Sequence, residues 1–130
     1  MNQTFHKKVS DIIREDPRYK TEAYEFVMEG LTYAQKKARR IRHVSGEELL
    51  DAMRELLLKQ FGPLTLTVLH HWGIRKTEDF GYIVFNLVSA GILSKEDDDS
   101  FQSFCNGYDF EEAFQKDYRR QLEKTVSRLR

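Results

Sequence analysis

The sequence has one cysteine, no net charge and no long apolar segment, and each of these absences excludes something. Its single cysteine, Cys105, cannot form a disulfide within the chain, which is compatible with a reducing cytoplasm. The 21 basic and 21 acidic side chains cancel, so no overall field favours nucleic acid or an anionic membrane. No stretch approaches the roughly 18 consecutive apolar residues of a membrane-spanning helix. We therefore expect a soluble, cytoplasmic protein without a membrane segment, in which any electrostatic function comes from local patches.

Several motifs that carry chemistry are also missing. The sequence has no glycine-rich phosphate loop, no G-x-S-x-G nucleophile motif and no H-E-x-x-H zinc motif. The run from Asp97 to Asp99 resembles the start of a calcium loop. However, Phe101 and Gln102 stand where that loop needs an oxygen ligand and a glycine. We therefore expect neither a metal site nor a cofactor.

The apolar side chains that are present follow helical spacing. A chain of 130 residues with 40% apolar content suits one helical domain over residues 1–130. We expect a short N-terminal helix and turn over residues 1–20, because Pro17 disfavours helical geometry at the residue before it. From Thr21, a good N-cap, apolar residues at spacings of three and four predict a helix that reaches about Ile41.

Start and stop signals define the helices in the middle of the chain. Ser45 and Glu48 form the pattern of a capping box, and Gly62 followed by Pro63 closes that helix and opens another. That helix runs to about Trp72, and a glycine turn precedes the next one. The N-cap predicted for this last helix is Thr77.

The last third of the chain combines a predicted hairpin with a charged helix. Asn106 and Gly107 are the preferred pair for a tight turn between two short strands with aromatic residues. Asp109 is the expected cap of a C-terminal helix or tail that includes residues 116–130. One face of this helix carries Phe114, Tyr118, Leu122 and Val126. The fold class predicted is mainly α, a helical domain with a small β-hairpin.

The second half of the chain resembles a winged helix, in which a recognition helix is followed by a hairpin wing. The charges at the expected DNA contacts are unfavourable, because Glu78 and Asp79 start the recognition helix and would repel phosphate. The expected wing, with Glu96 and three aspartates, is also acidic. We therefore favour a non-enzymatic protein-interaction module, with an unknown protein or a second copy as partner. The partner-binding candidates are Trp72, Tyr82 and Phe85.

Nucleic-acid binding is the first alternative, and it depends on two basic clusters. The candidate residues are Lys36, Lys37, Arg39, Arg40, Arg42, Arg75 and Lys76. The first cluster has another explanation, because basic residues at the end of a helix that begins with glutamates complement the helix dipole. We weigh helix stabilisation above nucleic-acid contact.

An enzyme of unknown type is the second alternative. Its only candidate residues are His70, His71, Asp79 and Cys105, and no motif assigns any of them a catalytic role. Adjacent helical residues point about 100° apart, so the two histidines do not readily bind one metal ion. A non-enzymatic role is therefore favoured.

Five phrases in the sequence together resemble an uncharacterised family associated with planctomycete and verrucomicrobial bacteria. They are "DPRY", "EAYEFV", "RHVSGEELLDAMRELLLKQFGP", "WGIRKTEDFGYIVFNLVSAGIL" and "GYDFEEAF". The resemblance covers the chain from about Ile13 to Phe114 and leaves out the tail after Lys116. It implies a bacterial and cytoplasmic protein. The family has no assigned activity, so no mechanism is implied.

Overall fold

The computed structural model describes residues 2–39, 44–94 and 101–129, and this part of the chain is all-α. The predicted helical character is confirmed, and the predicted hairpin is absent from these residues. The α-helices are α1 (Gln3–Glu15), α2 (Thr21–Ala38), α3 (Gly46–Phe61), α4 (Thr65–Trp72), α5 (Thr77–Ser89) and α6 (Asp117–Arg128). Two 3-10 turns, Gly62–Leu64 and Phe101–Phe104, and a π-helical turn, Glu112–Lys116, complete the described elements.

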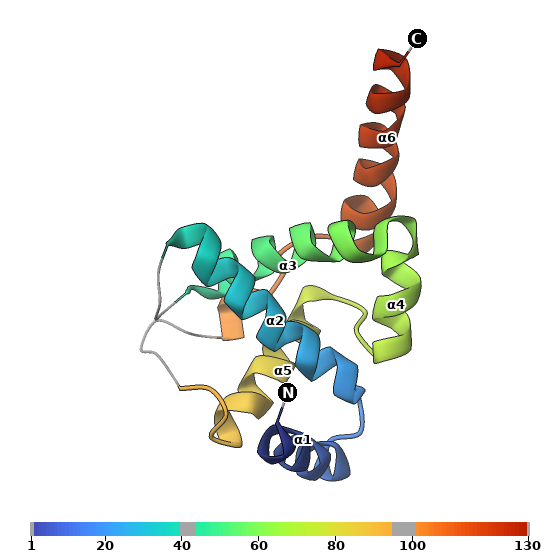
Figure 1. Ribbon diagram of the computed structural model, residues 1–130. Coiled ribbons are helices and arrows are strands. Elements are labelled where there is room, and N and C mark those ends of the chain that lie inside the picture. Colours follow the sequence, from blue (N-terminus) through green and yellow to red (C-terminus); the bar gives the residue numbers. More distant parts are fainter. Residues whose placement is uncertain (1, 40–43, 95–100, 130) are drawn as a thin grey trace.

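The helices α2 and α3 lie side by side at the centre of the fold, and α1, α4 and α5 are arranged around α2 (Figure 1). The close approach of α2 to α3 depends on Gly30, where an added Cβ would lie 2.6 Å from Cγ of Met53. Their buried apolar side chains join those of the other helices in one core cluster. Every helix of the described residues is too short or too polar to span a bilayer.

The capping box predicted for α3 is confirmed. The Ser45 side chain accepts a hydrogen bond from the Glu48 N–H at 3.1 Å, and the Glu48 carboxylate accepts one from the Ser45 N–H at 3.2 Å. The predicted end of α3 is confirmed as well, because Gly62 has a positive φ of 49° and Pro63 lies in the turn that leads into α4. Local sequence signals therefore determine these boundaries.

Two predicted boundaries are wrong in detail. Lys20, not Thr21, is the N-cap of α2, and that helix ends at Ala38 before the expected Ile41. It ends there because Arg39 adopts the left-handed conformation, with a φ of 56°, and its N–H returns to the carbonyl of Lys36. The remaining residues of the predicted last turn, 40–43, lie outside the described residues.

The predicted β-hairpin is wrong, because residues 101–110 are described and contain no strand. The backbone polar groups of this segment pair with the start of α5 instead of with a second strand. The Thr77 hydroxyl donates to the Phe104 carbonyl at 2.6 Å and accepts from the Gly107 N–H at 3.0 Å. Thr77 is therefore a buried anchor for this segment, and Lys76 is the N-cap of α5 in its place.

The winged-helix resemblance fails for the same reason. Without the hairpin, the described residues include no wing after α5. The acidic segment expected to form the wing, residues 95–100, lies outside the described residues.

The C-terminal helix begins as predicted and then leaves the body of the protein. The Asp109 carboxylate accepts a hydrogen bond from the Glu112 N–H at 2.9 Å, which confirms Asp109 as the cap. Phe114 on the π-helical turn is fully buried, whereas α6 extends away from the other helices (Figure 1). The predicted face of this helix is therefore buried at its start and uncovered beyond it.

Candidate functional site

The outward side of α5 carries Phe85, the most exposed aromatic side chain among the described hydrophobic residues, with 66% of its surface accessible. Tyr82 lies three residues earlier and so on the same side of the helix, where it is partly buried. Phe101, 37% exposed, packs against Tyr82 with their ring centroids 4.8 Å apart. We call Tyr82, Phe85 and Phe101 the aromatic face.

Arg18 supports the aromatic face from the turn after α1. Its guanidinium carbon lies 4.4 Å from the centroid of the Tyr82 ring, a cation–π distance. The same guanidinium donates two hydrogen bonds of 2.8 Å, one to each carboxylate oxygen of Asp16. This bidentate pair holds the pKa of the Asp16 carboxyl well below its usual range. The Tyr82 ring therefore contacts a cation that is itself fixed in place.

Asn86 connects the same region to the core. Its side-chain amide donates to Asp16 at 3.0 Å and to the Tyr24 hydroxyl at 3.1 Å. Asn86 lies one residue after Phe85 on α5, so these bonds fix the rotation of the helix beneath the aromatic face. A surface held in this way loses little conformational freedom when a partner binds.

Asp79 is an acceptor for the backbone at the start of α5. Its carboxylate accepts hydrogen bonds from the N–H groups of Arg75 and Lys76, at 2.8 and 3.2 Å. It also accepts a 2.5 Å hydrogen bond from the Tyr19 hydroxyl. Burial of the ring, together with this bond to a carboxylate, raises the pKa of Tyr19 well above its usual value. The geometry gives Asp79 a helix-capping role.

Trp72 is part of the core and not of the surface. It is only 8% exposed and packs against Phe26 and Phe61, with ring centroids 5.4 and 5.6 Å away. The structure therefore separates it from Tyr82 and Phe85, with which the sequence analysis grouped it. A bound protein would contact little of the Trp72 side chain.

The basic candidates fall into two separate groups. The Lys20 N–H donates to the Trp72 carbonyl, so the turn that holds Arg75 and Lys76 lies beside the start of α2. Lys36, Lys37 and Arg39 lie at the other end of α2, roughly 25 Å away at 1.5 Å per residue. Arg40 and Arg42 lie outside the described residues.

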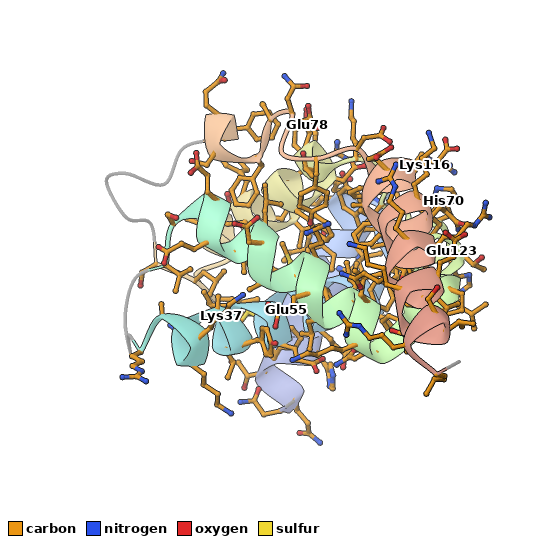
Figure 2. The ribbon with its side chains drawn as sticks, turned by 90° about the horizontal axis from the view of Figure 1, so that it is seen from above. Lys37, Glu55, His70, Glu78, Lys116 and Glu123 are labelled. Carbon is orange, nitrogen blue, oxygen red and sulfur yellow. The ribbon has the colours of Figure 1, made fainter. Side chains whose placement is uncertain are left out.

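In the group at the C-terminal end of α2, Lys37 has a structural partner. Its ammonium pairs with Glu55 on α3, and the two side chains lie next to each other in Figure 2. The Tyr33 hydroxyl donates to the same carboxylate at 2.7 Å. The Lys37 and Tyr33 hydrogen bonds lower the pKa of Glu55 to about 2. Lys37 therefore joins α2 to α3.

Arg75 and Lys76 line a surface hollow of about 580 Å³ between α4 and the base of α6. His70, Lys116 and Arg119 line it too, and Figure 2 shows Lys116 beside His70. The hollow also contains Asp109 and Glu111, and Lys116 pairs with Glu112 at 3.7 Å. The charges of this hollow are thus mixed, with basic groups in excess.

The four enzyme candidates do not form one site. His70 lines the hollow, but His71, Asp79 and Cys105 are not among its lining residues. Asp79 caps α5, and the Cys105 thiol lies 3.6 Å from the Phe101 carbonyl. No group of histidine, cysteine and carboxylate side chains in the described ranges is arranged to hold a metal ion.

Two residues of the aromatic face and its support, Phe101 and Arg18, were not predicted from the sequence. Phe101 was expected in a strand, and nothing in the phrase "DPRY" indicates that its arginine reaches Tyr82. The place of Tyr82 and Phe85 in the aromatic face could be predicted from the sequence, because both residues fall outside the apolar stripe of α5 that faces the core.

No protein-family model, curated protein or solved structure matches this chain. The resemblance to the planctomycete and verrucomicrobial family stays a prediction.

Proposed function

We propose that this chain is a non-enzymatic protein-interaction module that binds another protein chain through the aromatic face of α5. The observation that carries the proposal is the exposure of Phe85. A phenylalanine that is two-thirds exposed contributes little to the stability of its own fold. It does not gain the free energy that burial of its ring would supply. Binding energy at protein interfaces is concentrated in such aromatic and arginine side chains.

The supports of the aromatic face favour the same role. Tyr82 contacts both Arg18 and Phe101. Tyrosine, arginine and phenylalanine are all enriched in protein interfaces. The resemblance to a bacterial family implies that the module acts in a bacterial cytoplasm, and we include this location in the proposal.

The two alternatives have less support. For nucleic acid, the basic candidates that the structure describes lie in two groups at opposite ends of α2, and Lys37 is already paired with Glu55. For an enzyme, Asp79 already has three hydrogen-bond donors, and its fellow candidates do not share the hollow of His70.

Site-specific photo-cross-linking tests the proposal. A benzophenone amino acid replaces Phe85 in the full chain, expressed in the cells from which it comes, and the same amino acid replaces Ser10 as a control. Ser10 is an exposed position on α1. We expect a discrete adduct from position 85, identified by mass spectrometry as a partner or a second copy, and none from position 10. No adduct at position 85, or the same adducts from both positions, would refute the proposal.

A further inference from the structure

The hollow between α4 and the base of α6 has the size of a site for a small molecule. Its volume of about 580 Å³ lies within the usual range for ligand pockets, roughly 300–1,000 Å³. Its lining comes from α4, from the turn before α5, and from the segment that leads from Tyr108 into the base of α6. We call it the α4–α6 hollow. A hollow of this size, lined by several elements, suits one small ligand better than an extended polymer.

Basic side chains are in excess around the α4–α6 hollow. Four lysine and arginine side chains line it, together with one histidine and two carboxylates. These residues are Arg75, Lys76, Lys116, Arg119, His70, Asp109 and Glu111. The whole chain has no net charge, so the excess of two positive charges is a local feature of this hollow.

Most of these basic groups have no acidic partner. Among the residues that the structure describes, Arg75, Lys76 and Arg119 take part in no ion pair. Lys116 lies 3.7 Å from Glu112, but that carboxylate also pairs with a second basic residue of α6, at 3.1 Å. Two cations therefore share one carboxylate. The hollow keeps positive charge that an anionic ligand can neutralise.

The kind and number of these charges favour a phosphate group. The planar guanidinium groups of Arg75 and Arg119 can each donate two parallel hydrogen bonds to phosphate oxygens. A phosphate monoester carries a charge of about −1.5 to −2 at pH 7, which matches the excess of two positive charges better than a single carboxylate does. His70 adds a further N–H donor. The sequence has no glycine-rich phosphate loop, so side chains take the place of backbone N–H groups here.

Apolar surface in the same hollow provides for the rest of the ligand. Leu66, Tyr108 and Phe110 contribute to the lining. The Tyr108 hydroxyl donates to the Leu50 carbonyl at 3.0 Å, so its hydrogen is used within the fold and its ring is what it offers to a ligand. Sites for small molecules combine such apolar lining with a few polar groups. An organic phosphate therefore fits the hollow better than inorganic phosphate.

We propose that the α4–α6 hollow is a binding site for a small organic phosphate. Arg75 and Lys76 bind the phosphate group from the turn before α5, and Lys116 and Arg119 bind it from the base of α6. The residues of the aromatic face do not line this hollow, so the site is separate from the surface proposed for a partner protein. A ligand held in this way joins the base of α6 to the body and stabilises the folded state.

Isothermal titration calorimetry of the full chain, at about 50 mM salt, tests this inference. The probes are ADP, phenyl phosphate, inorganic phosphate and adenosine. We expect ADP or phenyl phosphate to bind about tenfold more tightly than inorganic phosphate. Adenosine, which has no phosphate, should not bind.

Charge variants identify the hollow as the site. Arg75→Gln with Arg119→Gln should weaken binding of the organic phosphate by about tenfold or more. Lys7→Gln with Lys36→Gln removes the same charge from exposed positions that do not line the hollow, and should change binding by less than about twofold. Glu111→Gln removes an acidic group from the hollow and should tighten binding by about threefold, a gain that unfolding cannot produce.

Several outcomes would overturn the inference. These are no binding of either organic phosphate, equal loss in the two double variants, no gain in Glu111→Gln, and adenosine that binds as tightly as ADP. A single-stranded oligonucleotide that binds more tightly than ADP through the same two arginines would make the hollow part of a nucleic-acid surface and would also contradict the inference. Phe85→Ala should bind ADP and phenyl phosphate as the unmodified chain does, so failure of the aromatic-face proposal would not affect this result.

Discussion

Arg18 connects the turn after α1 to the aromatic face of α5. It pairs with Asp16 through two hydrogen bonds and lies over the Tyr82 ring. Sequence patterns did not indicate this role, because the contact joins residues far apart in the chain and depends on how α1, α2 and α5 pack. By contrast, the exposure of Phe85 was predictable from its place outside the inward stripe of α5.

The Asp16–Arg18 pair makes the stability of the protein depend on pH. Arg18 lowers the pKa of Asp16 in the folded state, so the pair contributes stability above the unfolded-state pKa of about 4. That contribution is lost as the pH falls from there toward the folded-state pKa. We expect Asp16→Asn to lower the free energy of unfolding by about 1 kcal/mol at pH 7.

Urea denaturation over a series of pH values measures this effect. The difference between Asp16→Asn and the unmodified protein should be constant above pH of about 5 and shrink below about 4. A difference that stays the same down to pH of about 3 would show that the charge of Asp16 does not stabilise the fold.

At the scale of elements, local sequence signals were sufficient to predict a helix boundary where that boundary depends only on neighbouring residues. The capping box of α3, the Gly62–Pro63 junction and the Asp109 cap are of this kind. The Asn106–Gly107 pair misled the prediction, because the partner of Gly107 is the distant Thr77 hydroxyl. Thr77 is likewise a residue type that often caps helices, but its hydroxyl donates a hydrogen bond to the Phe104 carbonyl instead.

The turn between α4 and α5 depends on Gly73 for two reasons. Its φ of 90° is unfavourable for other residues, and an added Cβ would lie 2.1 Å from the Arg18 carbonyl oxygen. Gly91 has a φ of 76°, but the nearest atom to an added Cβ would be the Lys8 Nζ at 4.0 Å, an ordinary contact, so it serves as a matched control. We expect Gly91→Ala to cost about 1 kcal/mol, from backbone strain alone.

Gly73→Ala should cost clearly more, about 3 kcal/mol, because the turn must move away from Arg18 as well. Chemical denaturation of both variants measures the two free energies of unfolding. Equal losses would mean that the close approach to Arg18 does not constrain the turn.

At the scale of the whole molecule, the described residues bury one core and leave other apolar side chains uncovered. These include the aromatic face of α5 and, on α6, Leu122, Val126 and Leu129. The sequence predicted a mainly α domain and placed Leu122 and Val126 on one face of the last helix with the buried Phe114. The burial of Trp72 and the exposure of α6 depend on how the helices are arranged relative to one another. The periodicity of apolar residues in the sequence does not specify that arrangement.

The central claim is that Phe85 does not serve the fold of its own chain. A pair of substitutions on α5, Phe85→Ala and Phe80→Ala, tests it most directly, because Phe80 is fully buried on the same helix. Urea denaturation should give a free energy of unfolding for Phe85→Ala within about 0.5 kcal/mol of the unmodified protein. Phe80→Ala should lose about 3–5 kcal/mol. A loss of about 2 kcal/mol or more for Phe85→Ala would place that ring in the core and contradict the account.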